Sequence, residues 1–321
     1  MLFSEQGLIF RRNAKGGPLN QIIEKAYAKI NLGLQITGKR PDGYHLLSMV
    51  MQTVSLYDKV GIYRTNDSDE ISMDMDFGGR HPEEEITCDG DNLCVKAAKL
   101  ICGKLPESHG YYMHLVKNIP SAAGMAGGSS DAAAVLRGIN RIEGNYFSKE
   151  ELLSMALELG ADVPYCIDGG LALCEGIGEK LTPIEADFDA LLLLAKPAEG
   201  VSTPAAYRYY DDHQDTEHGD IAGVIDGIKK NDIFLISENI HNDLENAAKH
   251  FCPSISQIEE LMLAEGALLS KVTGSGPTVF GIFEADESRR SAAAALRETG
   301  LCADVIYADC ITPDYSDNSL D

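Results

Sequence analysis

Alternation of apolar and polar residues marks the first predicted element of the chain. Over residues 26–37 (AYAKINLGLQIT), small or apolar residues alternate with polar ones such as Lys29 and Asn31. A two-residue period predicts a strand, here one that carries its polar groups on a single face. We therefore expect structure to begin near Glu24, preceded by an N-terminal extension at 1–23.

The rest of the N-terminal half predicts further strands and helices. Strand-like runs lie within 48–63, and the acidic, glycine-containing stretch 66–91 is typical of hairpins and loops. The pattern then predicts a helix after Asp91, a strand over 111–117 and a helix over 131–142. A run of small residues joins this last strand to its helix.

A capping box predicts the start of the next helix. Ser148 is followed three residues later by Glu151, so that each side chain can bond the backbone N–H of the other residue. The helix is expected to continue to Leu159 and to end at Gly160, in the position that a left-handed C-cap favours.

The C-terminal half begins with an apolar run over 191–196 (LLLLAK), which predicts a buried strand. A polar, acidic loop is expected at 211–220, and the C-terminal DYSDNSLD is expected to be a solvated tail. Between them the pattern predicts helices at 221–229, 238–250 and 254–265, followed by two strands at 267–273 and 278–283 that a glycine turn at 274–277 joins. A helix at 286–299 and a strand at 303–309 complete this half. Helices on one face of an antiparallel sheet predict an α+β sandwich.

Charge and cysteine content narrow the possible partners. The chain has 27 lysine and arginine residues against 50 aspartate and glutamate residues, a formal net charge of −23, which argues against nucleic acid or an anionic membrane as a partner. No apolar run reaches the roughly 18 residues of a membrane span, and no secretory signal is recognisable. The eight cysteines include no C-x-x-C pair and no zinc spacing. We expect a cytoplasmic protein whose cysteines are buried thiols.

The small-residue segment 120–130 (PSAAGMAGGSS) is the first candidate for chemistry. Because it precedes a helix, backbone N–H groups and the positive end of the helix dipole converge where an anion could bind. Left-handed backbone is expected at its three glycines, since alanine tolerates positive φ poorly. Ser129 and Ser130 could cap the helix or donate hydrogen bonds to phosphate. The alternative is a tight loop packed on a sheet with two capping serines.

Other common nucleotide and hydrolase motifs are absent. No G-x-x-x-x-G-K-[ST], no strand followed by G-x-G-x-x-G, no kinase catalytic loop and no G-x-S-x-G elbow occurs. Lys29, Asp162 and the segment 273–278 (TGSGPT) could complete a site with the small-residue segment. Taken singly, each has a plainer interpretation: a solvated lysine, a turn aspartate and a hairpin.

Four segments taken together resemble the GHMP small-molecule kinases in order and spacing. They are AYAKINLGLQITGKRPDGYH at 26–45, NIPSAAGMAGGSSDAA at 118–133, GADVPYCIDGGLALCEGIGE at 160–179 and TGSGPTVF at 273–280. The sequences PDGYH at 41–45 and GADVP at 160–164 resemble the branch of the family whose substrate carries a cytidine diphosphate moiety. The resemblance extends from about Glu24 to Thr312.

This resemblance implies a role for each matching position. Lys29 and Asp162 match the catalytic pair. The residues that match the ATP phosphate loop are Pro120, Ser121, Ala122, Ala123, Gly124, Met125, Ala126, Gly127, Gly128, Ser129 and Ser130, with Met125 where leucine is frequent. Those that match the substrate site are Asn31, Tyr44, His45, Thr203 and Tyr207, and those of a third glycine motif are Gly274, Ser275 and Gly276. Tyr207, often phenylalanine in the family, is expected to stack on cytosine while His45 contacts the polar edge of the base.

The family also implies a fold and a reaction. We expect an α+β chain of GHMP kinase type, with an N-terminal ribosomal-S5-domain-2-like unit at 24–187, a C-terminal ferredoxin-like α/β sandwich at 188–312 and an acidic tail at 313–321. The expected reaction is ATP-dependent phosphorylation of the 2-hydroxyl of a diphosphocytidyl methylerythritol, with Mg²⁺ held by ligands that the sequence does not identify. Another GHMP kinase activity, on homoserine, mevalonate or a sugar, and a non-catalytic ligand-binding protein remain the alternatives. The protein would be a monomer or a homodimer.

Overall fold

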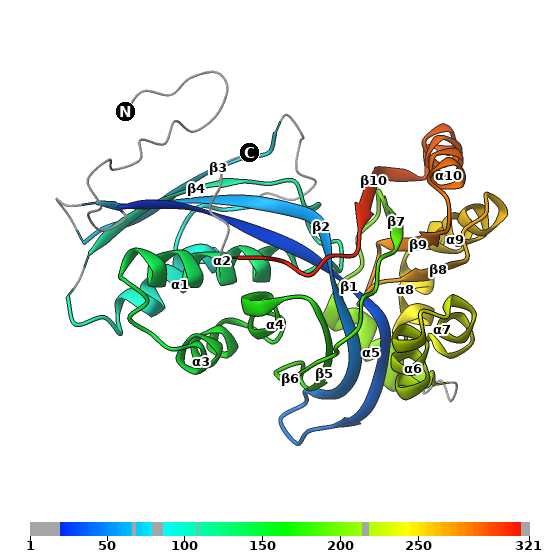
Figure 1. Ribbon diagram of the computed structural model, residues 1–321, viewed down its shortest axis with the longest axis horizontal. Helices are drawn as coiled ribbons and strands as arrows, with labels where there is room; N and C mark the ends of the chain where they lie inside the picture. Colours follow the sequence, from blue (N-terminus) through cyan, green and yellow to red (C-terminus); the bar gives the residue numbers. More distant parts are fainter. Residues whose placement is uncertain (1–19, 66–68, 79–85, 108, 214–217, 316–321) are drawn as a thin grey trace.

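Two sheets organise the chain, as seen in Figure 1. The structure is a computed structural model that describes residues 20–65, 69–78, 86–107, 109–213 and 218–315. No helix within these ranges is long and apolar enough to cross a membrane. The predicted extension at 1–23 lies outside the described residues up to position 19, and the first strand begins at Gln21.

The larger sheet has six strands. They are β1 (Gln21–Lys39), β2 (His45–Thr65), β3 (Ile71–Asp76), β4 (Gly110–Val116), β5 (Leu171–Gly176) and β6 (Lys180–Pro183). The order is β3-β4-β2-β5-β6, with β1 antiparallel to β2. The two predicted strand-like runs within 48–63 are therefore parts of one strand. The stretch predicted as hairpins and loops contains β3, which pairs with β4 in parallel rather than as a hairpin.

Four helices cover one face of this sheet (Figure 1). They are α1 (Leu93–Cys102), α2 (Gly127–Ile142), α3 (Lys149–Leu159) and α4 (Val163–Asp168). The capping box of Ser148 and Glu151 is confirmed, because both of its hydrogen bonds form. Gly160 is the C-cap, but its φ of 165° is extended, so the predicted left-handed conformation is wrong.

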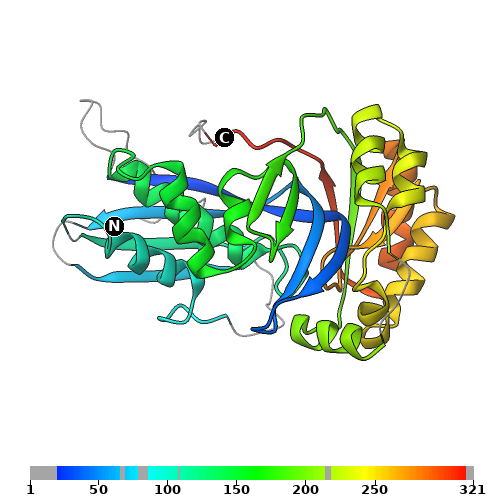
Figure 2. The same ribbon diagram turned by 90° about the horizontal axis from the view of Figure 1, so that it is seen from below.

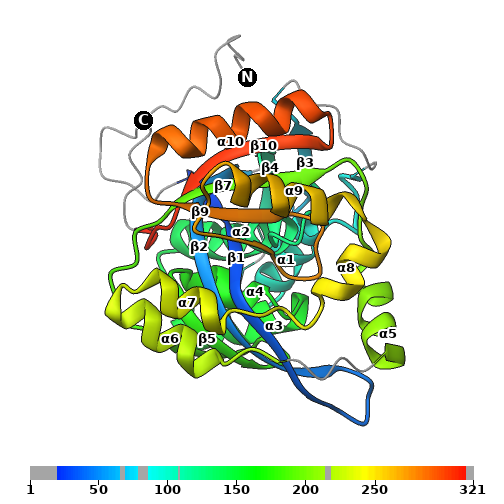
Figure 3. The same ribbon diagram turned by 90° about the vertical axis from the view of Figure 1, so that its right-hand side faces the viewer.

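The smaller sheet has the expected ferredoxin-like arrangement. Its strands are β7 (Leu191–Pro197), β8 (Leu269–Val272), β9 (Val279–Phe283) and β10 (Cys302–Asp309). The order β10-β7-β9-β8 is fully antiparallel and corresponds to 4-1-3-2. Helices α9 (Ser254–Ala264) and α10 (Asp286–Thr299) cover its outer face (Figure 3). The other face packs on β1 and β2, where Leu192 and Phe280 share a cluster with Ile30 and Val50.

The segment between β7 and β8 differs most from the prediction. Four helices occupy it, namely α5 (Thr203–His213), α6 (Ile221–Lys230), α7 (Ile233–Asn239) and α8 (Glu245–Phe251). The predicted loop at 211–220 thus begins inside α5. The predicted helix over 238–250 is interrupted at Asn242 and Asp243, because the Asn242 amide donates to Val272 O and Gly274 O. Contacts with another part of the fold replace the helical hydrogen bonds there.

The C-terminal segment is not entirely a solvated tail. The guanidinium carbon of Arg137, on α2, lies 3.8 Å from the centre of the Tyr315 ring, and Arg141 donates to the Tyr315 carbonyl. The chain therefore returns from β10 to the first sheet, as Figure 2 shows. Residues 316–321 lie outside the described part.

The cysteines are free thiols, as expected, but two are less buried than predicted. Cys88 is exposed and Cys302 is half-buried, whereas the other six are buried. Burial raises the pKa of Cys166 and of Cys174 to about 12, so these thiols stay protonated.

Candidate active site

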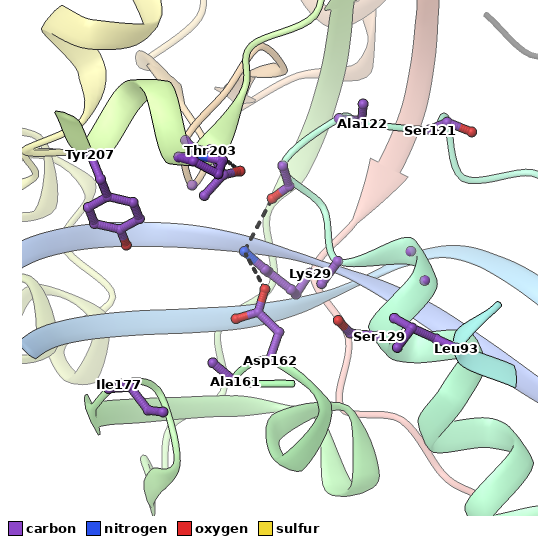
Figure 4. Close-up of a pocket in the computed structure, with 18 of the residues that line it drawn as sticks. Lys29, Leu93, Ser121, Ala122, Ser129, Ala161, Asp162, Ile177, Thr203 and Tyr207 are labelled. Atoms are coloured by element: carbon purple, nitrogen blue, oxygen red, sulfur yellow. Dashed lines mark hydrogen bonds and ion pairs between the residues drawn. The ribbon is translucent and has the colours of Figure 1, made fainter. Parts of the chain in front are cut away.

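A cavity of about 1100 Å³ lies where the two sheets meet. Its wall is formed by β1, the segment 120–129, the start of α4, helix α5 and the turn at 274–275. Figure 4 shows Tyr207 and Ile177 at one end, Leu93 and Ser129 at the other, and Lys29 beside Asp162 between them. Segments that are distant in the sequence, and that were expected to form one site, are thus brought together.

The position of Lys29 depends on irregularities in β1. The register of β1 against β2 shifts between Tyr27 and Lys29 and again between Asn31 and Gly33. Such bulges bend a strand and redirect its side chains. Lys29 and Asn31 lie between the two shifts and are both buried, so the strand directs two polar side chains inward at this point.

Lys29 and Asp162 form a loose ion pair. Their Nζ and Oδ2 atoms are 3.9 Å apart, with the lysine side chain 5% and the aspartate side chain 36% exposed. The ammonium also donates to Asn31 Oδ1 at 2.7 Å and to Gly124 O at 3.2 Å. Lys29 is therefore not the solvated lysine of the alternative interpretation.

Asp162 stands at the N-cap position of α4, but its side chain caps nothing. This carboxylate accepts no hydrogen bond from the backbone N–H groups of the helix. The alternative interpretation as a capping turn residue fails on this point. The carboxylate instead faces Lys29 across the cavity (Figure 4).

The backbone of the small-residue segment contradicts one prediction. Left-handed φ occurs at Ala122 (48°), Gly124 (72°) and Ala126 (58°), and not at Gly127 or Gly128. Two alanines therefore adopt the conformation that was assigned to glycine. The reason is that α2 begins at Gly127, four residues earlier than predicted, so both of these glycines belong to the helix.

Gly124 and Gly127 lie where a neighbouring segment approaches the backbone closely. A Cβ at Gly124 would lie 2.6 Å from Thr273 O and 2.9 Å from Gly276 O. A Cβ at Gly127 would lie 3.1 Å from a methyl group of Ile119. The small-residue segment thus packs directly on the third glycine motif, which forms the hairpin between β8 and β9 and also part of the wall of the cavity.

The beginning of α2 is open to a ligand. Its first turn contains no acidic residue, and no side chain caps it. The first N–H groups of a helix have no partner within the helix, so those of Gly127, Gly128 and Ser129 are available to an anion. The predicted capping by Ser129 or Ser130 is therefore wrong, and Ser130 Oγ instead donates to Tyr27 O at 2.7 Å.

A buried charge network, which was not predicted, holds both ends of this segment. Lys117 Nζ pairs with Asp131 Oδ2 at 2.7 Å and with Asp58 of β2. Asp58 Oδ1 also accepts hydrogen bonds from the backbone N–H groups of Asn118 and Ile119. Burial raises the pKa of Asp131, an effect that the Lys117 ammonium opposes. The one feature of the sequence that could have indicated this network is that Lys117 and Asp131 flank the small-residue segment.

The opposite end of the cavity is aromatic. The rings of His45 and Tyr207 are stacked, with centroids 4.6 Å apart and an interplanar angle of 17°. Thr203 Oγ1 lies 2.7 Å from Ser275 Oγ. Tyr44 also lines the cavity, but is 59% exposed. Asp211 joins this group through His45; it was missed because α5 was not predicted there.

Three of the predicted site residues do not line the cavity. Met125 and Ser130 are buried behind the segment, and Gly276 packs against Ala248. The remaining predicted residues all contribute to the wall. Within the described part of the chain, no group of three or more His, Cys, Asp or Glu side chains could hold a metal ion.

Comparison with known proteins shows which family the chain matches. The GHMP kinases N terminal domain matches residues 92–170, and the GHMP kinases C terminal domain matches residues 224–301. The 4-diphosphocytidyl-2-C-methyl-D-erythritol kinase of Clostridium beijerinckii is 43% identical over 260 residues, which are 81% of this chain and 90% of that protein.

Solved structures agree with this match. A crystal structure of 4-(cytidine 5'-diphospho)-2C-methyl-D-erythritol kinase has a TM-score of 0.72 at 28% identity, covering 90% of this chain and 98% of its own. The mevalonate kinase of L. major has the same TM-score of 0.72 at 14% identity, covering 92% and 98%, which is a likeness of fold alone.

The packing of Gly124 leads to a first prediction. Gly124→Ala should weaken ATP binding about 5- to 100-fold, because overpacking costs ~1–3 kcal/mol and displaces the small-residue segment. The matched control is Gly144→Ala, where φ is 74° but no atom lies within 4 Å of the added Cβ. Calorimetry with a non-hydrolysable ATP analogue measures the ATP affinity of both variants, and thermal denaturation measures their stability. Equal ATP affinities in the two variants would contradict the prediction.

Proposed function

The chain belongs to the GHMP kinase family, and from that premise we propose that it transfers the γ-phosphoryl group of ATP to the 2-hydroxyl of 4-diphosphocytidyl-2-C-methyl-D-erythritol. This reaction is a step of the non-mevalonate route to isoprenoid precursors. One observation carries the proposal: Lys29 and Asp162 face each other in the middle of a single cavity, between an anion-binding helix end and an aromatic end. A phosphate donor and a nucleoside-bearing acceptor would meet there.

The ATP phosphates are proposed to bind at the start of α2. The free N–H groups of Gly127, Gly128 and Ser129, together with the helix dipole, attract negative charge. Lys29 adds an ammonium on the side of the segment that faces the acceptor. The nucleoside of ATP would then extend toward Leu93, at the far end of the cavity.

Transfer requires an in-line hydroxyl and compensation of the charge on the transferring group. Asp162 is proposed to accept the proton of the 2-hydroxyl as its oxygen bonds to the γ-phosphorus and the bond to ADP breaks. Lys29 keeps the carboxylate directed at the acceptor and offsets charge on the phosphoryl oxygens.

Mg²⁺ is proposed to enter with ATP. Hard divalent ions in kinases take one or two protein oxygens and complete their shell with phosphate and water. The Ser129 hydroxyl, in the first turn of α2 and in the cavity wall, fits such a contact. Bound Mg²⁺ would supply charge compensation at the phosphates.

The protein is proposed to be a monomer or homodimer in the cytoplasm. Residues 24–187 and 188–312 are proposed as its two units. The passage of the chain from β6 to β7 between these ranges supports that division. Free thiols are compatible with a reducing compartment.

An assay of ADP release across several acceptors tests the function. The diphosphocytidyl substrate should support turnover, whereas homoserine, mevalonate and simple sugars should not. The fold alone does not distinguish between these acceptors, because the mevalonate kinase of L. major has a similar fold. Turnover with one of the other alcohols only would establish the first alternative, and binding of both ligands without turnover would establish the non-catalytic one.

Asp162→Asn separates a proton acceptor from a turn residue. It keeps the size of the side chain but removes its charge and basicity, so kcat should fall about 10²- to 10⁴-fold while ATP affinity is retained. Asp168→Asn, at the exposed end of the same helix, should leave kcat unchanged. Steady-state rates and melting temperatures of both variants are to be measured. A fall of only a few-fold would mean that Asp162 orients the hydroxyl without acting as a base.

Tyr207→Ala tests the aromatic end. Loss of base stacking costs ~1–3 kcal/mol, so KM for the cytidine substrate should rise about 5- to 100-fold with little change for ATP. Tyr207→Phe should preserve stacking and KM. Tyr209→Ala, which removes a ring that stacks on His213 and His250, is the control on the same helix. An unchanged KM in a folded Tyr207→Ala variant would remove this residue from the site.

A further inference from the structure

Helix α5 brings an unpredicted carboxylate to the aromatic end of the cavity. Asp211 Oδ1 lies 2.8 Å from Nε2 of His45, and Asp211 Oδ2 accepts a hydrogen bond from Lys39. His45 and Lys39 are paired residues at the ends of β2 and β1. One carboxylate from the second half of the chain thus holds both sides of the β1–β2 turn.

From this contact we infer that Asp211 is a specificity-determining positioning residue, which fixes the tautomer of His45 and thereby favours a base with an exocyclic amino group over one with a carbonyl group. The inference rests on the proposed function, in that it places the base of the acceptor substrate beside His45. It adds a residue, and a reason for base selectivity, that neither the sequence motifs nor the family match provides.

The carboxylate determines which imidazole nitrogen carries the proton. An ionised carboxylate only accepts hydrogen bonds, so the Nε2 atom of His45 must be the donor to it. In the neutral ring the other nitrogen, Nδ1, then holds a lone pair and accepts. Among the described residues Nδ1 has no hydrogen-bond partner, and His45 is one of the residues that line the cavity.

Asp211 is suited to remain ionised. Its partial burial would raise its pKa, but hydrogen bonds from Lys39 and His45 outweigh burial and lower the pKa below its ordinary value. The ring itself is well fixed, because the His45 side chain is only 8% exposed and stacks on Tyr207. In the neutral ring, the acceptor nitrogen is therefore held in one place and in one tautomer.

The two pyrimidines differ at the atom that this nitrogen can distinguish. Cytosine carries an amino donor at position 4, whereas uracil carries a carbonyl acceptor there, like thymine. An acceptor at Nδ1 forms a hydrogen bond with the amino group of cytosine and is repelled by the carbonyl oxygen of uracil. A site built around such a contact leaves a polar group unsatisfied when the wrong base binds, and so discriminates strongly.

A set of matched variants tests the inference by binding alone. Calorimetry at pH 8 compares CDP with UDP on the full-length protein, so that the result does not depend on turnover. The wild-type protein should prefer CDP by at least about 10-fold. Asp211→Asn should reduce that preference to within about threefold, because a carboxamide can present either an acceptor or a donor to Nε2. Asp212→Asn changes the exposed neighbour on the same helix and should leave the preference intact.

A double-variant cycle with His45→Ala distinguishes tautomer control from support of the helix. If Asp211 acts through His45, adding Asp211→Asn to His45→Ala should cause no further loss of base preference. The inference is overturned if the wild-type protein binds CDP and UDP equally, if Asp211→Asn keeps the preference, or if it still reduces it in the His45→Ala background. The proposed function fails separately: a protein that prefers CDP but releases no ADP with the full substrate retains the base selectivity and loses the kinase assignment.

Discussion

The ammonium of Lys117, buried between the carboxyl groups of Asp58 and Asp131, makes the interaction on which the small-residue segment depends. Lys117 precedes the segment, Asp131 follows it in the first turns of α2, and Asp58 belongs to the central strand β2. Burying these charges is costly, and it is compensated only while each has its partner. Although burial disfavours the charged ammonium, Asp131 and Asp58 raise the pKa of Lys117, so the ammonium keeps its charge. Both ends of a nearly side-chain-free segment are thereby fixed without any polar residue within it.

The long ribbon of β1 and β2 transmits this order to the rest of the site. β2 pairs with β4 through one half of its length and with β5 through the other, so one strand supports both regions of the larger sheet. Opposite it, the edge of β1 pairs with the C-terminal half, since Leu34 exchanges backbone hydrogen bonds with His241 and Asp243. Between these fixed regions, the bulges of β1 turn Lys29 and Asn31 inward. Lys29, one of the proposed catalytic pair, is therefore positioned by contacts from both halves of the chain.

What the sequence predicts well in this protein is local and periodic. The strand around Lys29, the capping box of Ser148 and the C-terminal alternation of helices and strands follow from spacing, and the four motifs indicate the family. The failures occur where distant contacts decide the conformation. Ala122 and Ala126 adopt left-handed backbone, Ala126 as the N-cap of α2, while Gly127 lies inside the helix, where a Cβ would press on Ile119. The helix predicted over 238–250 is broken because Asn242 bonds the carbonyl of Gly274. α5 was missed because its acidic C-terminal end has the composition of a loop, and with it Asp211 was missed.

The overall charge of −23 and the anionic ligands proposed for the site impose opposite requirements. A net negative charge repels nucleotides, so their binding must depend on positive charge concentrated inside the cavity. Lys117 contributes little there, since Asp58 and Asp131 neutralise it, and Lys39 is engaged by Asp211. Lys29, Arg208 on α5 and the open end of α2 remain, and Lys29 donates to the carbonyl of Gly124 in the segment that leads into α2. Part of the attraction for phosphate thus lies at the place where transfer is proposed to occur. The apposed carboxylate of Asp162 offsets the charge of Lys29, and the same ammonium is proposed to serve both binding and chemistry.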